Sequence, residues 1–357
     1  MRRTVLKDIA DKVGCSIAVV SYVVNNSAGN ISCSPELREH ILSVAEELEY
    51  TQHYASRALK KQRSYNIGIY IPEYTVFDAA FNREREIISG AESVCDKSSY
   101  ELVVIMDDND SPDIKCNLKF NSHRIDGLIA LHANNNSGWI ERLAASDKNI
   151  VAVNYYGSAG VDVVNFDQVE ASRLAVLELA KFSHRRIGCI GSPGNMSGED
   201  SALRLEGFKK AFTEIGLHID PSMIFMPDGN LDLHQSAANI ASRIMAMPPE
   251  QRPTAIIGFS ETSLLLVLNE LVLNGIRMPE DISMIGIDDS PLCQFFSPEL
   301  SCVKQPFRKL GMFAAERAIK IAEERFENRL RKKEHEHTAR IVEPELVLRD
   351  SIAAAGK

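Results

Sequence analysis

The stretch TVLKDIADKVGCSIAVVSYVVNN, residues 4–26, has the pattern of two short helices joined by a tight turn. Apolar residues recur three and four positions apart on each helix: Leu6, Ile9, Ala10 and Val13 on the first, Val20 and Val24 on the second. Gly14 permits the sharp turn, and Ser16 can cap the second helix by accepting from its first backbone N–H groups. This pattern predicts a helix-turn-helix, whose second helix offers its outward side chains to base edges in DNA. An ordinary helical hairpin packed into a core would have the same spacing.

The residues after this hairpin predict a third helix. Ser34, Pro35 and Glu36 have the order of an N-cap, a first helical residue and an acidic first turn. Apolar residues then repeat at helical spacing: Leu37, Ile41, Val44 and Leu48. We therefore expect a three-helix domain that is complete by Tyr50, followed by a basic run at 57–63 and then by the first strand.

Length and composition limit the class of protein. A chain of 357 residues is too long for one ordinary core, so a small head and a body of one or two lobes are expected. Its hydrophobic content of 45% and charged content of 25% are those of a soluble globular protein. The sequence has no run of 18 apolar residues and no apolar segment behind Arg2 and Arg3. It therefore indicates neither a membrane span nor a secretory signal, and a cytoplasmic location is expected.

The charge is distributed unevenly along the chain. The net charge is −9, but residues 1–63 hold nine Lys and Arg against seven Asp and Glu, which leaves −11 for the remainder. The head is mildly basic and the body is acidic. A charge of +2 is small for a DNA-binding domain, so phosphate contacts from a dimer and from the run at 57–63 must supply much of the affinity.

From residue 65 onward, β-branched runs alternate with amphipathic stretches. The expected strands are 67–71, 102–106, 127–131, 150–153, 187–190, 223–226, 255–259 and 284–287. The expected helices are 81–98, 138–146, 168–182, 200–215, 233–247, 261–274 and 307–325. This alternation predicts parallel sheets covered by helices on both faces, and the interruption near 155–165 favours two sheets over one. Ligands bind beyond the carboxyl ends of such strands, so a cleft between two lobes is the expected ligand site.

Other kinds of site find little support. The glycine-rich run 188–198 lacks the spacing of a phosphate-binding loop. His335, Glu336 and His337 lie in a run of alternating charge that is typical of a solvated segment, and the seven scattered cysteines include no Cys-x-x-Cys pair. Asp288 and Asp289 are adjacent at a strand end and point in opposite directions, so only one of them is expected to accept from ligand hydroxyls. We expect no catalytic residue, no metal site and no cofactor.

Several motifs together resemble those of one family. The head has KDIA, a turn, VVS, VVNN, AEELEY and ASRALKK in order. The body has DGLIAL at 126–131, HRRIGCIG at 184–191, RLEGFKKAF at 204–212, a run from 253 to 292, and EPELVLRDS at 343–351. In this order they resemble the lactose/galactose repressor family of bacterial transcription regulators over nearly the whole chain. The resemblance implies a helix-turn-helix head followed by an α/β body of two parallel-sheet lobes, similar to periplasmic sugar-binding proteins.

The resemblance also implies boundaries. The DNA-binding domain would span 1–50, the hinge 51–63 and the effector-binding and dimerisation core 64–357. Lobe one would hold about 64–164 and 292–323, and lobe two about 165–291 and 324–357. Double-stranded operator DNA, a small effector and a second copy of the chain are the implied partners, with a dimer or a higher oligomer expected.

The implied DNA contacts lie in the head and the hinge: Thr4, Ser16, Ile17, Ala18, Ser21, Tyr22, Asn25, Arg57 and Leu59. Ile17, Ala18 and Tyr22 would face bases, and Ser16, Ser21 and Asn25 would lie near phosphates. Leu59 would wedge open a base step from the minor groove. The chain departs from the family with Val19 for Thr, Tyr22 for Arg, Gln52-His53 for Pro-Asn and Ala55 for a larger residue. These departures predict a changed half-site and weaker hinge packing.

The implied effector contacts follow strand ends: Phe77, Asp78, Asn154, Arg204, Ser260 and Asp288. Arg204 and Asp288 offer a forked donor and an acceptor for the vicinal hydroxyls of a sugar, although the two could instead form a structural salt bridge. Ser260-Glu261 replaces the common Asn-Asp pair, so the particular sugar does not carry over. We therefore expect a sugar-controlled repressor and not an enzyme. A purine or phosphorylated metabolite is the alternative effector, activation stays open, and a sugar-binding protein without DNA function is the alternative class.

Overall fold

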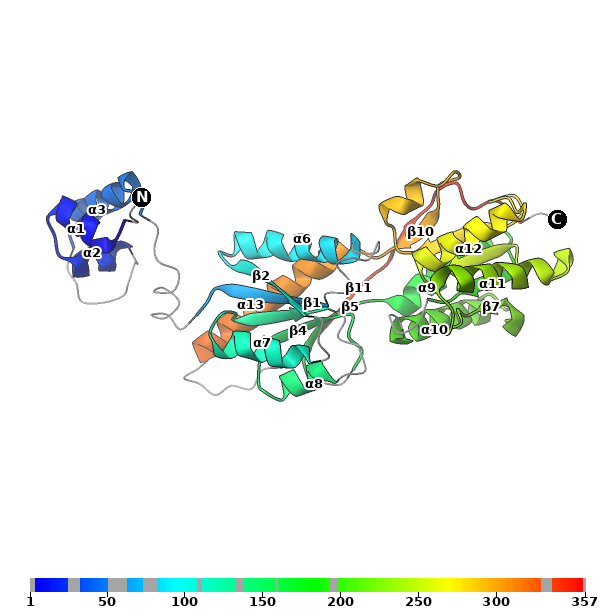
Figure 1. Cartoon of the computed structure of the whole chain (residues 1–357), viewed down its shortest axis with the longest axis horizontal. Helices are drawn as coiled ribbons and strands as arrows, with labels where there is room; N and C mark the ends of the chain where they lie inside the picture. The colour runs from blue at the N-terminus through cyan, green and yellow to red at the C-terminus, as the bar shows by residue number, and fades with distance from the viewer. Residues whose placement is uncertain are drawn as a thin grey trace. The chain divides into compact units, whose positions relative to one another are not determined.

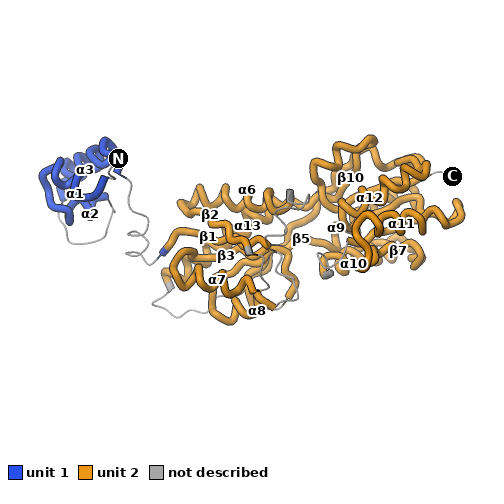
Figure 2. Tube along the Cα trace, in the orientation of Figure 1, with its two compact units in different colours: residues 1–63 blue, residues 64–357 orange. Residues whose placement is uncertain are grey.

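The computed structural model describes residues 4–24, 33–50, 63–72, 82–107, 111–131, 138–157, 160–192, 198–328 and 336–355. The chain divides into two compact units, residues 1–63 and residues 64–357 (Figure 2). The division lies where the sequence pattern ends the hinge. Of the hinge itself, 51–63, only Arg63 is among the described residues.

The head contains the three helices that the sequence predicts. They are α1 (Leu6–Val13), α2 (Ile17–Val24) and α3 (Pro35–Glu47). Gly14 ends α1 with a φ of 75°, and Ser34 caps α3 by accepting from the Leu37 N–H at 3.2 Å. The buried core consists of Ile9, Ala10, Val20, Val23, Ile41, Val44 and Ala45. Val24, which the spacing placed on the seam, is half-buried and packs against this core, and Val23 beside it is more deeply buried.

The first sheet of the body has the strand order β11-β5-β4-β3-β1-β2 and is parallel throughout. Its strands are β1 (Asn66–Pro72), β2 (Glu101–Asp107), β3 (Gly127–Ala130), β4 (Ile150–Val153), β5 (Asp162–Phe166) and β11 (Ala339–Val342). Its helices are α6 (Asn82–Lys97), α7 (Pro112–Asn121), α8 (Trp139–Ala144) and α13 (Phe307–Asn328) (Figure 1). Along β1, Ile67 and Ile69 pack in the core with α6 and α13, whereas Tyr70 packs with α7 and α8. Helices therefore cover both faces.

The second sheet repeats this plan with the order β12-β10-β9-β8-β6-β7. Its strands are β6 (Ile187–Ile190), β7 (Ile224–Phe225), β8 (Ala255–Gly258), β9 (Ser283–Ile287), β10 (Ser301–Lys304) and β12 (Glu345–Val347). Its helices are α9 (Gln168–Lys181), α10 (Gly198–Glu214), α11 (Leu233–Ala246) and α12 (Glu261–Leu273), with short 3-10 turns at 221–223, 249–251 and 291–294. The β10–β12 pairing is antiparallel and the others are parallel.

The observed sheets correct three expectations. Four strands were missed: β5, β10, β11 and β12, together with helix α7. The interruption near 155–165 contains β5, whose buried positions alternate with half-buried ones and so give a weaker apolar run. The lobe boundaries also differ, since 301–304 pairs in the second sheet and 339–342 in the first. Short terminal strands carry few apolar residues, so hydrophobicity alone does not assign them to a sheet.

The helix pair α6 and α13 crosses closely because glycine lies at each contact. A Cβ added at Gly90 would overlap the carbonyl oxygen of Arg308, and one added at Gly311 would overlap that of Ile87. Only glycine permits this approach. Since α13 follows β10 of the second sheet directly, this crossing also ties the second sheet to the first. None of the described helices combines the length and apolar character that a membrane crossing requires.

Candidate DNA-recognition helix and effector site

Helix α2 presents a face without charge. The Ser16 hydroxyl accepts from the Val19 N–H at 3.3 Å, so the helix begins at the position that the sequence predicts. Ile17 is 48% exposed and Ala18 is also exposed, whereas Ser21 and Tyr22 are half-buried. The Tyr22 ring packs against the head core. The face can therefore offer methyl groups and hydroxyls, and Tyr22 has restricted freedom to reach outward.

Thr4 has a partner within the head. Its hydroxyl donates to the Leu48 carbonyl at 2.9 Å and joins the start of the head to the end of α3. A hydroxyl has one proton to donate, so in this arrangement Thr4 cannot also donate it to a phosphate. Three further expected DNA contacts, Asn25, Arg57 and Leu59, lie outside the described residues.

The structure describes four of the expected effector residues. Three of them follow the carboxyl ends of strands, and Arg204 lies on α10. Asn154 follows β4, Ser260 follows β8, and Asp288 follows β9. The strand order reverses at β1 and β3 in the first sheet and at β6 and β8 in the second, which are the positions where open parallel sheets bind ligands. Phe77 and Asp78, expected after β1, lie outside the described residues.

Asn154 and Asp288 both have left-handed backbone conformations. Their φ angles are 51° and 90°, unusual for residues other than glycine. The Asn154 side-chain oxygen accepts from the Phe166 N–H at 2.8 Å, so part of its amide serves the backbone between β4 and β5. The Asp288 carboxylate accepts from the Gln305 amide. Strain of this kind is common where a side chain is aimed at a ligand.

Arg204 is buried and held on two sides. Its Nε donates to the Gln168 side-chain oxygen at 2.7 Å, and its Nη1 donates to the Phe259 carbonyl. Within the described part of the chain, Arg204 and Asp288 do not form an ion pair with each other, so the salt-bridge interpretation is wrong for this conformation. Ser260 caps α12 by accepting from the Ser263 N–H at 3.4 Å. Asp289 instead pairs with Arg349 at 2.7 Å, so the two adjacent aspartates have different surroundings.

Charges from both sheets converge near Asp288. Burial lowers the pKa of Arg83, but the carboxylates of Glu84, Asp288 and Asp200 outweigh it and raise the pKa. Arg83 lies at the start of α6 on the first sheet, whereas Asp200 and Asp288 belong to the second. The site therefore contains an electrostatic link between the two sheets.

Tyr156 adds a hydroxyl to this group. It follows Asn154 and lies beside Gln168, Asp200 and Arg204. Burial and the neighbouring Asp200 carboxylate raise the pKa of Tyr156 far above its usual value, so the hydroxyl stays protonated. It can therefore donate a hydrogen bond at any physiological pH.

Three buried polar atoms around the site have no hydrogen-bond partner among the described residues: Gln168 Nε2, Asp200 Oδ1 and Gln305 Oε1. A buried polar group without a partner costs about 1–3 kcal/mol. One of these atoms is a donor and two are acceptors. Each belongs to a side chain that contacts another residue of the site: Gln168 contacts Arg204, Asp200 lies beside Tyr156, and Gln305 contacts Asp288. A ligand with hydroxyl groups can satisfy both kinds of atom.

The sequence interpretation missed five residues of the site: Arg83, Tyr156, Gln168, Asp200 and Gln305. Asp200 could have been found, because it precedes Arg204 by four residues and therefore shares its helix face. Gln305 follows β10, a strand that was itself missed. Tyr156 lies in the connection between β4 and β5, whereas Arg83 and Gln168 lie in the first turns of α6 and α9, where apolar spacing does not show which polar side chain reaches a site.

Comparisons with known proteins match both units. Residues 5–52 match the family described as bacterial regulatory proteins, lacI family, and residues 176–352 match the periplasmic binding protein-like domain. The ribose operon repressor of Haemophilus influenzae is 28% identical over 97% of this chain and 98% of its own length. The transcriptional repressor PurR of Aliivibrio fischeri is 27% identical over 98% of each chain.

Solved structures match the fold over nearly the whole chain. The lac repressor dimer bound to operator and the anti-inducer ONPF has a TM-score of 0.77 at 22% identity, and covers 99% of this chain and 100% of its own. The complex of the transcriptional regulator CelR with cellobiose has a TM-score of 0.67 at 21% identity, and covers 98% and 100%.

Fold and sites together define a class: a helix-turn-helix head joined to a two-sheet body of the periplasmic-binding-protein type. The head is therefore a helix-turn-helix domain of the lacI type, and the whole chain is similar to transcriptional repressors that are 27–28% identical to it. The two relatives named above are both repressors.

Proposed function

We propose that this chain is a DNA-binding repressor controlled by a small neutral saccharide bound at the carboxyl ends of the two sheets. The observation that carries this proposal is the set of unpaired buried atoms on Gln168, Asp200 and Gln305, beside the buried Arg204. Carboxylate, amide and guanidinium groups together are suited to the several hydroxyls of a sugar. The ribose repressor among the relatives and the cellobiose complex among the solved structures support the same class of ligand.

The charges of the site favour a neutral ligand over an anionic one. The described charged groups of the proposed site include two cations, Arg83 and Arg204, and three carboxylates, Glu84, Asp200 and Asp288. An added phosphate would meet a site that already carries excess negative charge, at short range and partly shielded from water. A phosphorylated metabolite is therefore the less favoured effector.

A purine is the second candidate, because PurR of Aliivibrio fischeri is a relative over nearly the full length. A purine needs a flat apolar surface as well as hydrogen-bonding groups. In the described part of the site, Tyr156 supplies one aromatic ring, and it is surrounded by polar groups. A ribose or hexose makes better use of these groups than a purine does.

DNA binding is proposed to use α2 of two chains on a pseudo-palindromic operator. Two-fold symmetric sites require two-fold symmetric proteins. A candidate contact between copies is the β2/α7 patch, formed by Val104 and Met106 on β2 and by Ile114 and Leu118 on α7. These side chains are 45–68% exposed, β2 is at the edge of the first sheet, and the two elements are in contact. A second copy that covers this patch would remove exposed apolar surface from water.

The saccharide can change DNA affinity only by binding two states of the dimer unequally. Groups from both sheets meet at the site, so a bound ligand favours one arrangement of the two sheets. We propose that this preference is transmitted to the hinge, 51–63, and thereby to the heads.

The test is calorimetric and thermal-shift titration of the full chain with D-ribose, D-glucose, cellobiose, hypoxanthine and ribose 5-phosphate. Asp200→Asn is the site variant, and Glu199→Gln, exposed on the same helical turn, is the matched control. A sugar should stabilise the wild type and the control, and its affinity for the site variant should fall about tenfold or more, since bonds to a charged partner contribute 1.5–3 kcal/mol. Stabilisation by hypoxanthine or ribose 5-phosphate alone would reject the saccharide.

The alternative class, a sugar-binding protein without DNA function, is tested separately. Selection of binding sites from random double-stranded DNA with the full chain should return a symmetric sequence. If no sequence is enriched while sugar binding is intact, the chain is not a sequence-specific repressor, although the saccharide proposal still holds.

A further inference from the structure

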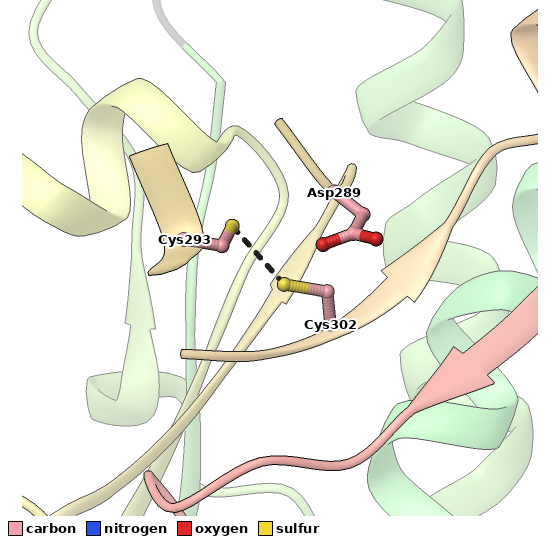
Figure 3. A group of neighbouring side chains, drawn as sticks. All are labelled: Asp289, Cys293 and Cys302. Atoms are coloured by element: carbon pink, nitrogen blue, oxygen red, sulfur yellow. Dashed lines mark hydrogen bonds between the residues drawn. The ribbon is translucent and has the colours of Figure 1, made fainter. Parts of the chain in front are cut away.

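Two cysteines lie in contact behind the effector site. Cys293, in the 3-10 turn after β9, and Cys302, on β10, have their sulfur atoms 3.2 Å apart (Figure 3). Both side chains are fully buried, and neither is in a disulfide. The Leu300 N–H donates to the Cys293 carbonyl at 2.9 Å, so the two backbone segments are neighbours. Formation of an S–S bond of about 2.05 Å would require the sulfurs to approach by only about 1.2 Å.

Each sulfur has a different charged neighbour. The Cys293 S–H donates to Glu261 Oε1 at 2.7 Å, and the same oxygen accepts from Ser290. The Cys302 S–H can donate to Cys293 Sγ at 3.2 Å or to the Leu300 carbonyl at 3.3 Å, and Arg349 Nη1, which donates to that carbonyl at 2.7 Å, also donates to Cys302 Sγ at 3.4 Å. A guanidinium at this position stabilises negative charge on the sulfur once the proton is lost, so Cys302 is assigned the first attack, and Cys293 the second with Glu261 as its proton acceptor.

The pKa directions of Cys293 and Glu261 agree with the role of each in the second attack. The hydrogen bond with Cys302 and burial raise the pKa of Cys293, so this sulfur keeps its proton at rest. Burial raises the pKa of Glu261, which makes its carboxylate a stronger base than an exposed one.

A metal is a poorer occupant of the same cluster. A carboxylate oxygen of Asp289, Cys293 Sγ and Cys302 Sγ lie within 4.8 Å of one another. The Asp289 carboxylate is already paired with Arg349 at 2.7 Å, and the Cys293 thiol with Glu261. A cation would have to displace a buried guanidinium and remove two thiol protons. Formation of a disulfide leaves the Asp289–Arg349 pair in place.

We propose that Cys293 and Cys302 form a reversible disulfide when a small peroxide reaches them. The Cys302 thiolate attacks one oxygen of hydrogen peroxide, the O–O bond breaks, and hydroxide leaves a sulfenic acid on Cys302. Cys293 then attacks that sulfur as Glu261 takes its proton and passes it to the sulfenic hydroxyl, which leaves as water. In total, two thiols and one peroxide give one disulfide and two waters, and the dithiol supplies the two electrons.

The bond would alter the edge of the effector site. Asp288 precedes the turn that holds Cys293, and Ser260 precedes Glu261. Oxidation removes the S–H that donates to Glu261 and fixes the turn to β10. Oxidation of the two cysteines therefore changes the conformation available to Asp288 at the end of β9, whichever effector binds.

The experiment uses the reduced full chain treated with hydrogen peroxide, alkylated after denaturation, digested with trypsin and analysed by mass spectrometry. No Lys or Arg lies between residues 278 and 303, so both cysteines fall in the peptide 278–304. We expect this peptide to lose two hydrogens and to resist alkylation until dithiothreitol is added. Cys15 and Cys33, which are half-buried in the head, serve as accessible reference thiols in the same sample.

Variants separate the steps. Cys293→Ser should leave a sulfenic acid on Cys302 that dimedone traps, and Cys302→Ser should give neither product. Glu261→Gln should slow disulfide formation about tenfold or more by removing the base. Hydrogen exchange of residues 288–294 should be slower in the oxidised wild type than in the reduced one.

Two results would overturn the proposal. The first is complete alkylation of both thiols after a treatment that oxidises Cys15 and Cys33. The second is one equivalent of zinc on the reduced wild type that Cys293→Ser loses, which would identify a metal site instead.

Discussion

The recognition helix of the head and the effector site of the body use opposite kinds of side chain. Helix α2, IAVVSYVV, has no charged residue and exposes Ile17 and Ala18. The effector site gathers Arg83, Arg204 and Asp288, with buried polar atoms that lack partners. Direct readout by α2 therefore depends on methyl groups, hydroxyls and shape, and electrostatic affinity for DNA must come from elsewhere in the dimer. In the proposed effector site, by contrast, charged groups are available to discriminate between ligands.

The largest expected effect tests whether head and body are independent. Ile9 is fully buried in the small head core, and Ile9→Ala should cost about 2–5 kcal/mol of head stability. A domain of this size has little stability to lose. We expect loss of DNA binding in fluorescence anisotropy, with unchanged sugar-induced stabilisation of residues 64–357.

Val5→Ala is the matched control, because Val5 is 44% exposed. It should retain both activities. If Ile9→Ala abolished the sugar response as well, the two units would not be independent and the comparison would fail.

The next effect tests the charged site. Asp288→Ala should lower the affinity for a stabilising sugar about 10- to 100-fold, because a hydrogen bond to a charged acceptor contributes 1.5–3 kcal/mol. Calorimetric titration measures the loss directly. Glu280→Ala, at an exposed position of the same lobe, should bind as the wild type does. If the Asp288→Ala protein binds the sugar with wild-type affinity, Asp288 does not contact the sugar.

The sequence predicted the regular parts of the molecule more accurately than the site. The bounds of β4 and β6 agree with the structure, because each is a short apolar run with clear ends. β11 and β12 were missed, since they are short, partly exposed and paired with strands far away in the chain. Such pairing depends on the tertiary fold, which local periodicity does not encode.

The same limit applied to the effector site. The motif resemblance implied Asn154, Ser260 and Asp288, and the structure places each directly after a strand that the sequence predicted. Gln305 follows a missed strand, and Arg83 reaches Asp288 across a separation of 205 residues. The motif resemblance supplied Arg204, whose Gln168 and Phe259 partners only the fold brings together.

A smaller effect concerns Leu59 of the hinge, which lies outside the described residues. Leu59→Ala should reduce affinity for the selected operator roughly tenfold, because an apolar wedge in the minor groove stabilises bent, specific DNA. Affinity for random DNA of the same length should not change, since nonspecific binding comes from phosphate contacts. Equal losses on both DNAs would contradict the wedge role.

The smallest effect concerns which base pair the uncharged helix prefers. Tyr22 packs its ring against the head core and has one hydroxyl, whereas an Arg at this position has a longer reach and a fork that matches guanine O6 and N7. Tyr22→Arg should therefore shift the preference at one base pair of each half-site toward G·C by about 1 kcal/mol, near the lower limit for such contacts. Because the ring is only half-buried, the head should stay folded. Parallel binding-site selections with the wild type and the variant measure the shift, and Ala18→Ser, a small change on the same exposed face, controls for altered packing of α2. Identical selected sequences for wild type and Tyr22→Arg would mean that residue 22 reads no base, and that the head recognises DNA through Ile17, Ala18 and backbone shape alone.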